Sequence, residues 1–233
     1  MPDQLSIAID DTATTSARLY EDLAATDLGA TLILAHGAGA GQTSPFIVCF
    51  AEGLAARGLP VVTFNFLYTE QGRRAPDRRP KLEACYRAVV DSVRTRAPER
   101  ALLIGGKSMG GRIATQIAAA PGAEDEAGLP AADIGGVVAL GYPLHPPGRP
   151  DKMRDAHLPR ITVPVLVIQG ARDTFGTDAE LRPVLARMPQ ARLHVIEGGD
   201  HSLNIRRKSP PPQDVIHAGV MDEIVRWTSR VVG

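Results

Sequence analysis

Cysteine is scarce in this chain, and long apolar runs are missing. The 233 residues include two cysteines, Cys49 and Cys85, and both fall in segments with helical patterning. Two isolated thiols do not make the disulfide framework of a small secreted domain, so we expect buried free thiols in a reducing compartment. No apolar stretch approaches the roughly 18 residues that a membrane-spanning helix needs. These absences predict a soluble, cytoplasmic protein without a membrane partner.

Net charge is also missing, because 26 basic side chains balance 26 acidic ones. A neutral chain gives no overall electrostatic reason to expect a nucleic-acid partner. Residues 1–11 are acidic and lack the apolar region of a signal peptide. No internal repeat, low-complexity tract or convincing domain boundary is visible. We therefore predict one domain over residues 1–233.

Apolar segments rich in β-branched residues alternate with helical patterns along most of the chain. Ser44 and Asp178 are expected to cap the helices that follow them. Strands are expected at 31–37, 59–66, 101–107, 134–143, 163–173 and 191–199, and helices at 45–58, 81–97, 110–120, 179–188 and 214–232. This alternation is typical of an α/β fold with a mostly parallel, doubly wound sheet and helices on both faces. Ligands of such sheets bind beyond the carboxyl ends of the strands.

A cluster of glycines surrounds Ser108 in the segment GGKSMGGR, residues 105–112. The segment lies between an expected strand and an expected helix, and it fits the pattern G-x-S-x-G. In that context the glycines let strand and helix approach closely, and the sharp turn holds the serine hydroxyl clear of the backbone. The new helix also directs free N–H groups at developing negative charge. The pattern predicts a nucleophilic serine.

The glycine cluster has two other interpretations. A glycine-rich turn between a strand and a helix can hold phosphate, but neither the GxxxxGK[ST] nor the GxGxxG spacing is present. The five-residue pattern also occurs by chance in many proteins. No two histidines lie four residues apart with a glutamate between them, which disfavours a zinc hydrolase. We expect no cofactor and no metal.

A serine hydroxyl needs a base, and the base needs an acid that orients it. Asp173 follows the strand expected at 163–173, and His201 follows the last expected strand in a glycine-containing loop. The order serine, aspartate, histidine is that of the α/β-hydrolase triad. Each residue alone has an ordinary explanation, because Asp173 could cap a turn and His201 could be a solvated histidine. As the acid that orients His201, Asp173 is preferred to Asp200. Asp200 is adjacent to His201 in the sequence, and the side chains of adjacent residues in an extended loop usually point apart.

An oxyanion hole requires two backbone N–H groups near the serine. We predict the N–H of Met109, directly after the nucleophile, and that of Ala38 in the segment HGAGAG, residues 36–41. The second assignment is open by one residue in either direction. The other interpretation of residues 36–41 is a flexible glycine loop.

Together, GGKSMGGR, HGAGAG, GARD with Asp173 and GGDHS with His201 resemble the α/β-hydrolase superfamily. More narrowly, HGAGAG, NFLYTEQGRRAPDR, GGKSMGGR and GYPLHPPG resemble a small family over residues 30–230. That family includes bacterial predicted hydrolases, a testis-expressed protein and a subunit of a histone-acetyltransferase complex. The resemblance implies the fold and the triad Ser108, Asp173 and His201, but no substrate. Its chromatin-complex member implies that the scaffold can serve without known catalysis.

Three loops are expected to shape the site. The segment 144–162 is short and rich in proline, so it cannot build a large apolar lid, and we expect an open site rather than an interfacial lipase. The segments 67–81 and 204–212 are basic. Each is either an ordinary solvated surface or a rim that attracts acidic acyl or phosphate-bearing substrates. On the second interpretation, Arg73 and Arg74 bind substrate.

These observations predict a serine hydrolase of the carboxylesterase or thioesterase type, acting on a small acyl substrate through an acyl-enzyme. Esterases, thioesterases and peptidases share this constellation of residues. A serine nucleophile disfavours dehalogenase and epoxide-hydrolase chemistry, which use an aspartate there, and the dienelactone type, which uses a cysteine. The alternative function is a binding or scaffold protein that keeps the fold without catalysis.

Overall fold

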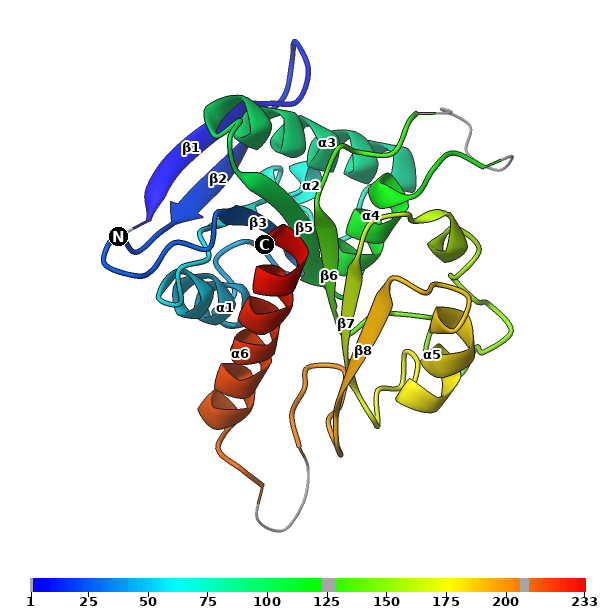
Figure 1. Ribbon diagram of the computed structural model, residues 1–233. Coiled ribbons are helices and arrows are strands. Elements are labelled where there is room, and N and C mark those ends of the chain that lie inside the picture. Colours follow the sequence, from blue (N-terminus) through cyan, green and yellow to red (C-terminus); the bar gives the residue numbers. More distant parts are fainter. Residues whose placement is uncertain (1, 123–128, 206–209) are drawn as a thin grey trace.

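The computed structural model describes residues 2–122, 129–205 and 210–233. Within these ranges eight strands form one sheet in the order β1-β2-β4-β3-β5-β6-β7-β8 (Figure 1). In chain order the strands are β1 (Asp3–Ala8), β2 (Thr14–Tyr20), β3 (Ala30–Ala35), β4 (Val61–Phe64), β5 (Ala101–Lys107), β6 (Gly136–Leu140), β7 (Val165–Gly170) and β8 (Ala191–Ile196). Strand β2 runs antiparallel to β1 and β4, and all the other pairings are parallel.

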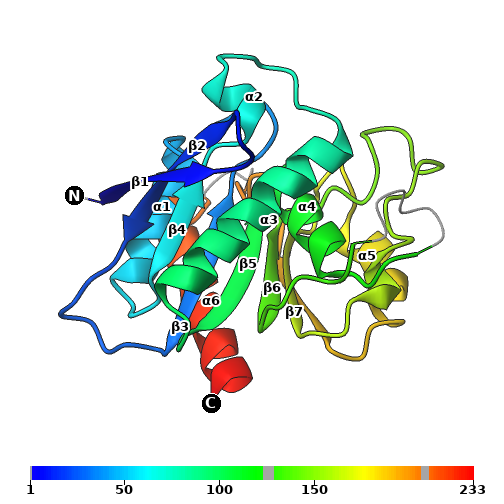
Figure 2. The same cartoon turned by 90° about the horizontal axis from the view of Figure 1, so that it is seen from above.

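Helices cover both faces of the sheet. They are α1 (Pro45–Ala55), α2 (Leu67–Glu70), α3 (Arg79–Arg96), α4 (Met109–Ala118), the short 3₁₀ helix η1 (Leu158–Arg160), α5 (Asp178–Leu185) and α6 (Gln213–Val232). Helices α1 and α6 share one core layer, and α3, α4 and α5 share the other (Figures 1 and 2). No helix within the described ranges is long and apolar enough to cross a bilayer.

Strand β3 shows why the sheet needs both layers. All six of its residues are buried. Ile33 and Ala35 contribute to the core layer beneath α3 and α4, whereas Leu32 and Leu34 contribute to the layer beneath α1 and α6. Burying one such aliphatic side chain stabilises the fold by about 1.5–3 kcal/mol. A strand that is apolar on both faces is therefore stable only between two layers of helices, and the predicted fold class is confirmed.

The hairpin of β1 and β2 is an element that the sequence pattern did not predict. Its turn is held by Asp10, whose Oδ1 accepts the N–H groups of Thr12 (2.8 Å) and Ala13 (2.9 Å). In β1 only Ile7 is buried, since the strand lies at the edge of the sheet. A strand with one buried residue carries too little apolar periodicity to stand out in the sequence.

Two expected helix caps differ in the structure. The N-cap of α5 is Thr177 rather than Asp178, which is the first helical residue. Thr177 and Glu180 form a capping box, in which the N–H of Glu180 donates to Thr177 Oγ1 (3.3 Å) and the N–H of Thr177 donates to the Glu180 carboxylate (2.8 Å). Ser44 does occupy the N-cap position of α1, but its side chain makes no capping hydrogen bond and lies at a cavity instead.

Candidate active site

Ser108 lies in the tight turn between β5 and α4. Its φ of 52° and ψ of −114° lie in a region that non-glycine residues rarely adopt. Such a conformation costs about 1–3 kcal/mol and persists only where the surroundings impose it. Here the N–H of Ser108 donates to the Leu140 carbonyl (2.9 Å), and its own carbonyl accepts the N–H of Arg112 (3.0 Å) as α4 begins. The backbone is therefore fixed on both sides of the serine.

The glycines before and after Ser108 are required by close contacts between main chains. A Cβ at Gly106 would lie 2.6 Å from the Ala35 carbonyl oxygen, and a Cβ at Gly110 would lie 2.5 Å from the same atom. Carbon and oxygen atoms do not approach so closely without a bond. The predicted reason for the glycine cluster, a close approach of strand and helix, agrees with these contacts.

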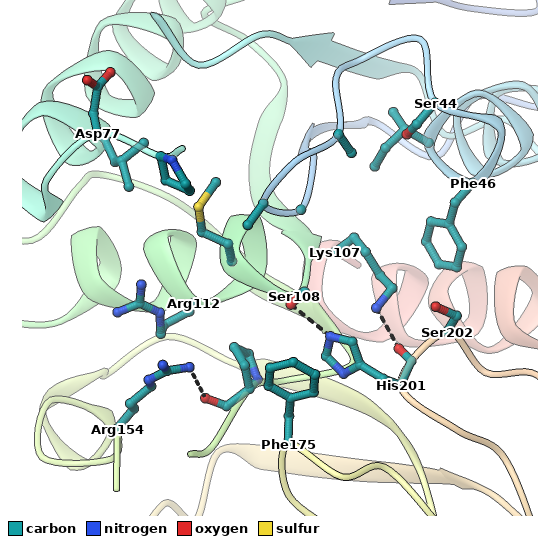
Figure 3. Close-up of a pocket in the computed structure, with 18 of the residues that line it drawn as sticks. Ser44, Phe46, Asp77, Lys107, Ser108, Arg112, Arg154, Phe175, His201 and Ser202 are labelled. Atoms are coloured by element: carbon teal, nitrogen blue, oxygen red, sulfur yellow. Dashed lines mark hydrogen bonds between the residues drawn. The ribbon is translucent and has the colours of Figure 1, made fainter. Parts of the chain in front are cut away.

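The structure brings Ser108, His201 and Asp173 into one hydrogen-bonded chain. His201 Nε2 lies 2.8 Å from Ser108 Oγ, and His201 Nδ1 lies 2.7 Å from Asp173 Oδ2 (Figure 3 shows the first contact). The buried carboxylate favours the tautomer that carries hydrogen on Nδ1, so the Nε2 lone pair faces the serine hydroxyl. This arrangement can transfer the serine proton to the histidine.

The carboxylate of Asp173 is fully buried and fully paired. Its Oδ2 accepts the side-chain amide of Gln169 (2.8 Å) as well as His201, and its Oδ1 accepts the N–H of Phe175 (2.8 Å). A buried carboxylate is tolerated only with such partners. Gln169 was not predicted as a site residue, although a glutamine at the end of an apolar strand is the signal that could have found it.

Phe175 packs against the imidazole of His201. Their ring centroids lie 4.2 Å apart, with 29° between the ring planes. The aromatic ring covers one face of the imidazole and restricts its rotation. The side chain of His201 is 21% exposed, so it remains open to the cavity while Asp173 behind it is closed off from solvent.

Lys107, the residue before Ser108, holds the backbone of the loop that carries His201. Its side chain is buried, and Nζ donates to the carbonyl oxygen of His201 at 2.5 Å (Figure 3). The ring of Phe46 lies 5.7 Å from the ammonium group. Burial lowers the pKa of Lys107 to about 8, against the opposing effect of the Asp173 and Asp200 charges. The sequence pattern did not single out this lysine.

The loop after β3 lies against Ser108, where the oxyanion hole is predicted. A Cβ at Gly37 would be 3.6 Å from Ser108 Cβ, and both Ala38 and Met109 line the cavity beside the serine. Within the described ranges, the N–H groups of Ala38 and Met109 have no protein acceptor. Their role as oxyanion donors stays a prediction.

Buried His36 fixes the start of this loop. Its Nδ1 donates to the Gly37 carbonyl (2.8 Å), and its Nε2 accepts the N–H of Phe66 (3.1 Å). Burial lowers the pKa of His36, which keeps the ring neutral and able to make both hydrogen bonds. The imidazole thus connects the loop after β3 to the residues that lead into α2.

A cavity of about 590 Å³ lies beside Ser108 and His201 (Figure 3). Its cationic lining residues are Arg79, Lys107, Arg112 and Arg154. Arg73 and Arg74, predicted as substrate-binding residues, are exposed and do not line it. Of the basic segment 204–212, residues 206–209 lie outside the described ranges.

The remaining acidic and histidine candidates have structural partners. Asp200 Oδ1 accepts the N–H groups of Ser202 (2.8 Å) and Asn204 (3.0 Å), so it shapes the histidine loop rather than orienting the imidazole. The other partners are Glu180 for His145, Thr115 for His157, and Cys49 and Gln213 for His217. The described residues contain no cluster of three or more histidine, cysteine or acidic side chains that could hold a metal ion.

Comparison with known proteins places this geometry in context. Residues 29–229 match the model of a family described as "Alpha/beta hydrolase domain". An α/β serine hydrolase homologue from Coxiella burnetii is 16% identical with a TM-score of 0.70, and the alignment covers 98% of this chain and 96% of that one. A serine hydrolase without a lid from Xanthomonas campestris is 18% identical with a TM-score of 0.71, covering 97% and 94%.

A third solved structure is similar to the same extent. An esterase from Pyrococcus furiosus is 17% identical with a TM-score of 0.72, and the alignment covers 100% of this chain and 92% of that one. At these identities the three structures establish the fold. The narrower resemblance to the testis-expressed and histone-acetyltransferase-complex proteins stays a prediction.

Proposed function

This chain belongs to the alpha/beta hydrolase family, and from that premise we propose that it is a serine hydrolase for small ester or related acyl substrates. The observation that carries the proposal is the continuous chain of hydrogen bonds from Ser108 through His201 to Asp173 at the wall of a cavity. A serine paired with a base, and a base paired with a buried acid, is the arrangement that activates a hydroxyl nucleophile.

In the acylation step, Ser108 Oγ attacks the carbonyl carbon of the substrate while His201 Nε2 takes its proton. Asp173 stabilises the positive charge that forms on the imidazole. The N–H groups of Met109 and Ala38 donate hydrogen bonds to the oxyanion. Removing one such donor typically lowers kcat by about 10²–10³. His201 then gives its proton to the leaving alcohol or thiol, which leaves an ester between Ser108 and the acyl group.

In the second step, water hydrolyses the acyl-enzyme with the same groups in the same roles. His201 takes a proton from water as its oxygen attacks the acyl carbon, and it returns the proton to Ser108 Oγ as the acid leaves. The overall reaction consumes one water and yields an acid and an alcohol or thiol. This chemistry uses only groups of the chain, the substrate and water.

The composition of the cavity wall supports a small, soluble substrate. Of the segment 144–162, which was expected to be too short for a lid, only Arg154 is among the residues that line the cavity. Nothing in that segment offers the broad apolar surface on which a lipid aggregate would rest. Small carboxylic esters and thioesters are therefore the substrates that we would test first.

The test is intact-mass analysis after exposure to a fluorophosphonate probe, which reacts with activated serines. The wild type should gain one adduct, and Ser108→Ala should gain none. Ser202→Ala is the matched control, because Ser202 also lines the cavity but, among the described residues, its hydroxyl is not hydrogen-bonded to a histidine, and it should react as the wild type does. No adduct on folded wild type would contradict the proposal and favour the non-catalytic scaffold.

A further inference from the structure

Two arginines stand on the cavity wall close to the nucleophile. Arg112 lies one turn after Ser108 on α4, and its side chain lines the same cavity as the serine (Figure 3). Arg154 comes from the segment after β6 and lies beside Arg112 (Figure 3). Two positive charges thus share one side of the cavity.

Neither guanidinium has a carboxylate partner within the described ranges. Arg112 Nε is buried and has no hydrogen-bond acceptor there. Arg154 Nη1 donates only to the carbonyl oxygen of Pro143, at a long 3.3 Å. Unpaired arginine groups with partial burial are uncommon in folded proteins, because loss of hydration costs free energy that no partner returns.

The other charged side chains of the cavity each make a shorter hydrogen bond within the chain. Arg79 Nε donates to Glu83 (2.5 Å), and Lys107 donates to the His201 carbonyl. The cavity also contains one carboxylate outside the triad, Asp77, and its Oδ1 accepts Arg73 Nη2 at 2.6 Å. Among the cationic groups that line the cavity, Arg112 and Arg154 are thus the ones with neither an ion pair nor a short hydrogen bond within the described ranges.

The two arginines repel each other and are held in place by other contacts. Burial and the nearby charge of Arg154 both lower the pKa of Arg112, although a guanidinium stays protonated at neutral pH. The N–H of Arg154 donates to the Leu144 carbonyl (2.8 Å), and its carbonyl accepts the buried Tyr142 hydroxyl (2.6 Å). An anion between the two guanidinium groups would relieve the repulsion and supply the missing acceptors.

We propose that Arg112 and Arg154 form an anion subsite that selects esters bearing a carboxylate or phosphate group near the reacting carbonyl. The inference rests on the proposed serine hydrolase activity and specifies its substrate class. Arginine suits this role because its planar group donates two parallel hydrogen bonds to a carboxylate or phosphate. The bound anion would place the ester carbonyl over Ser108.

The experiment compares kcat/KM for four esters that differ in where a negative charge lies. They are phenyl acetate, with none; monophenyl succinate, with a carboxylate on the acyl part; 4-acetoxybenzoate, with a carboxylate on the leaving group; and the acetyl ester of a hydroxyalkyl phosphate. Wild type should prefer one or more of the charged esters over phenyl acetate. Which ester is preferred identifies the carboxylate or the phosphate as the recognised group.

Arg112→Gln and Arg154→Gln should each lower the ratio of charged-ester to neutral-ester kcat/KM by roughly 10- to 100-fold, the loss expected for hydrogen bonds to a charged group. Arg112→Lys, which keeps the charge but not the planar fork, should retain part of the ratio. Arg149→Gln removes an exposed arginine paired with Asp151 in the same segment as Arg154, and it should leave the ratio at the wild-type value.

If the ratio of charged-ester to neutral-ester kcat/KM is unchanged in both glutamine variants, and phenyl acetate is still hydrolysed, the anion subsite is wrong. The proposed hydrolase activity would be unaffected by that result. If the wild type hydrolyses no ester, binding of succinate and of inorganic phosphate to Ser108→Ala is measured by calorimetry instead. Binding that is at least tenfold weaker in Ser108→Ala with Arg112→Gln supports the subsite, and binding that is absent or unaffected contradicts it. Circular dichroism confirms that each variant is folded.

Discussion

The two sides of the cavity differ in how completely their polar groups are paired. On the side of His201, both imidazole nitrogens and both oxygens of Asp173 have hydrogen-bond partners within the chain. On the side of Arg112, Nε is buried without an acceptor, and neither it nor Arg154 is in an ion pair with a described carboxylate. On the His201 side the protein itself pairs all of these polar groups, so we call it the saturated side. On the Arg112 side it does not.

This difference separates two tasks. Groups that move protons must keep a fixed geometry, and hydrogen bonds within the fold provide it without help from a ligand. Groups that recognise a ligand must keep donors available, which costs stability in the empty protein. The pairing state of a buried polar group is therefore informative about its function even before a substrate is known.

The largest expected effect comes from breaking the saturated side at Asp173. In Asp173→Asn, the amide can no longer stabilise the imidazolium and favours the wrong tautomer of His201. We expect kcat for the preferred ester to fall by about 10³–10⁴, as for the same substitution in other serine triads. Steady-state kinetics measures the loss.

Asp200→Asn is the matched control for that substitution, since Asp200 is adjacent to His201 but accepts backbone N–H groups in its own loop. An asparagine keeps an acceptor oxygen for those bonds, so we expect a loss of less than about fivefold. A larger loss in Asp200→Asn than in Asp173→Asn would show that the carboxylates have been assigned the wrong way round.

An intermediate effect is expected at Lys107, which belongs to the saturated side but carries a buried charge. In Lys107→Met the His201 carbonyl loses its donor, and we expect kcat to fall by about tenfold, the effect of one charged hydrogen bond. The exposed Lys152→Met is the matched control and should retain full activity. Full activity in Lys107→Met would show that the loop does not need this contact.

The same lysine gives a pH dependence of stability. Its pKa is about 8 in the folded protein, below the usual 10.5, so the unfolded chain binds more protons between these values. The free energy of unfolding should therefore rise with pH in this window, by on the order of 3 kcal/mol relative to Lys107→Met. Urea unfolding of both proteins at pH 7, 9 and 10 measures it. Parallel curves would contradict the lowered pKa of Lys107.

The smallest effect is expected at Arg73 and Arg74, the arginines that the sequence placed near substrate. Both are exposed and do not line the cavity, and the ion pair of Arg73 with the cavity residue Asp77 is shared with Lys81, which lies 3.8 Å from the same oxygen. Replacing both with glutamine should change kcat/KM for charged and neutral esters by less than about twofold at physiological salt. A selective loss of kcat/KM for charged esters would show that Arg73 and Arg74 recognise the substrate. It would weaken the contrast between the saturated side and the side of Arg112.

The fold, and the proximity of Ser108, Asp173 and His201, could be predicted because their signals are local. Strand β3 is buried throughout and apolar at every position but Thr31, and the turn at Ser108 needs glycines within two residues on either side. The positions of Asp173 and His201 follow once the strands are parallel, since the carboxyl ends of such strands share one edge. Short-range patterns and one topological rule were therefore sufficient for these features.

The rest depends on contacts between distant segments. Gln169 and Lys107 look like isolated polar residues in apolar strands until Asp173 and the His201 carbonyl are seen beside them. Arg112 and Arg154 are 42 positions apart, and nothing local marks them as neighbours on one wall. A single sequence also gives no sign of which arginines lack an acid, because pairing is decided by the packed structure.

The contact of Gly106 and Gly110 with the carbonyl of Ala35 has a consequence for how this protein can change. The turn that carries Ser108 is packed main chain against main chain, so its position is set chiefly by the backbone. Residues of the wall can be exchanged while the reacting atom stays in place. New substrate preferences are then reachable by single substitutions that leave the chemistry intact, which makes the scaffold adaptable in selection and in the laboratory.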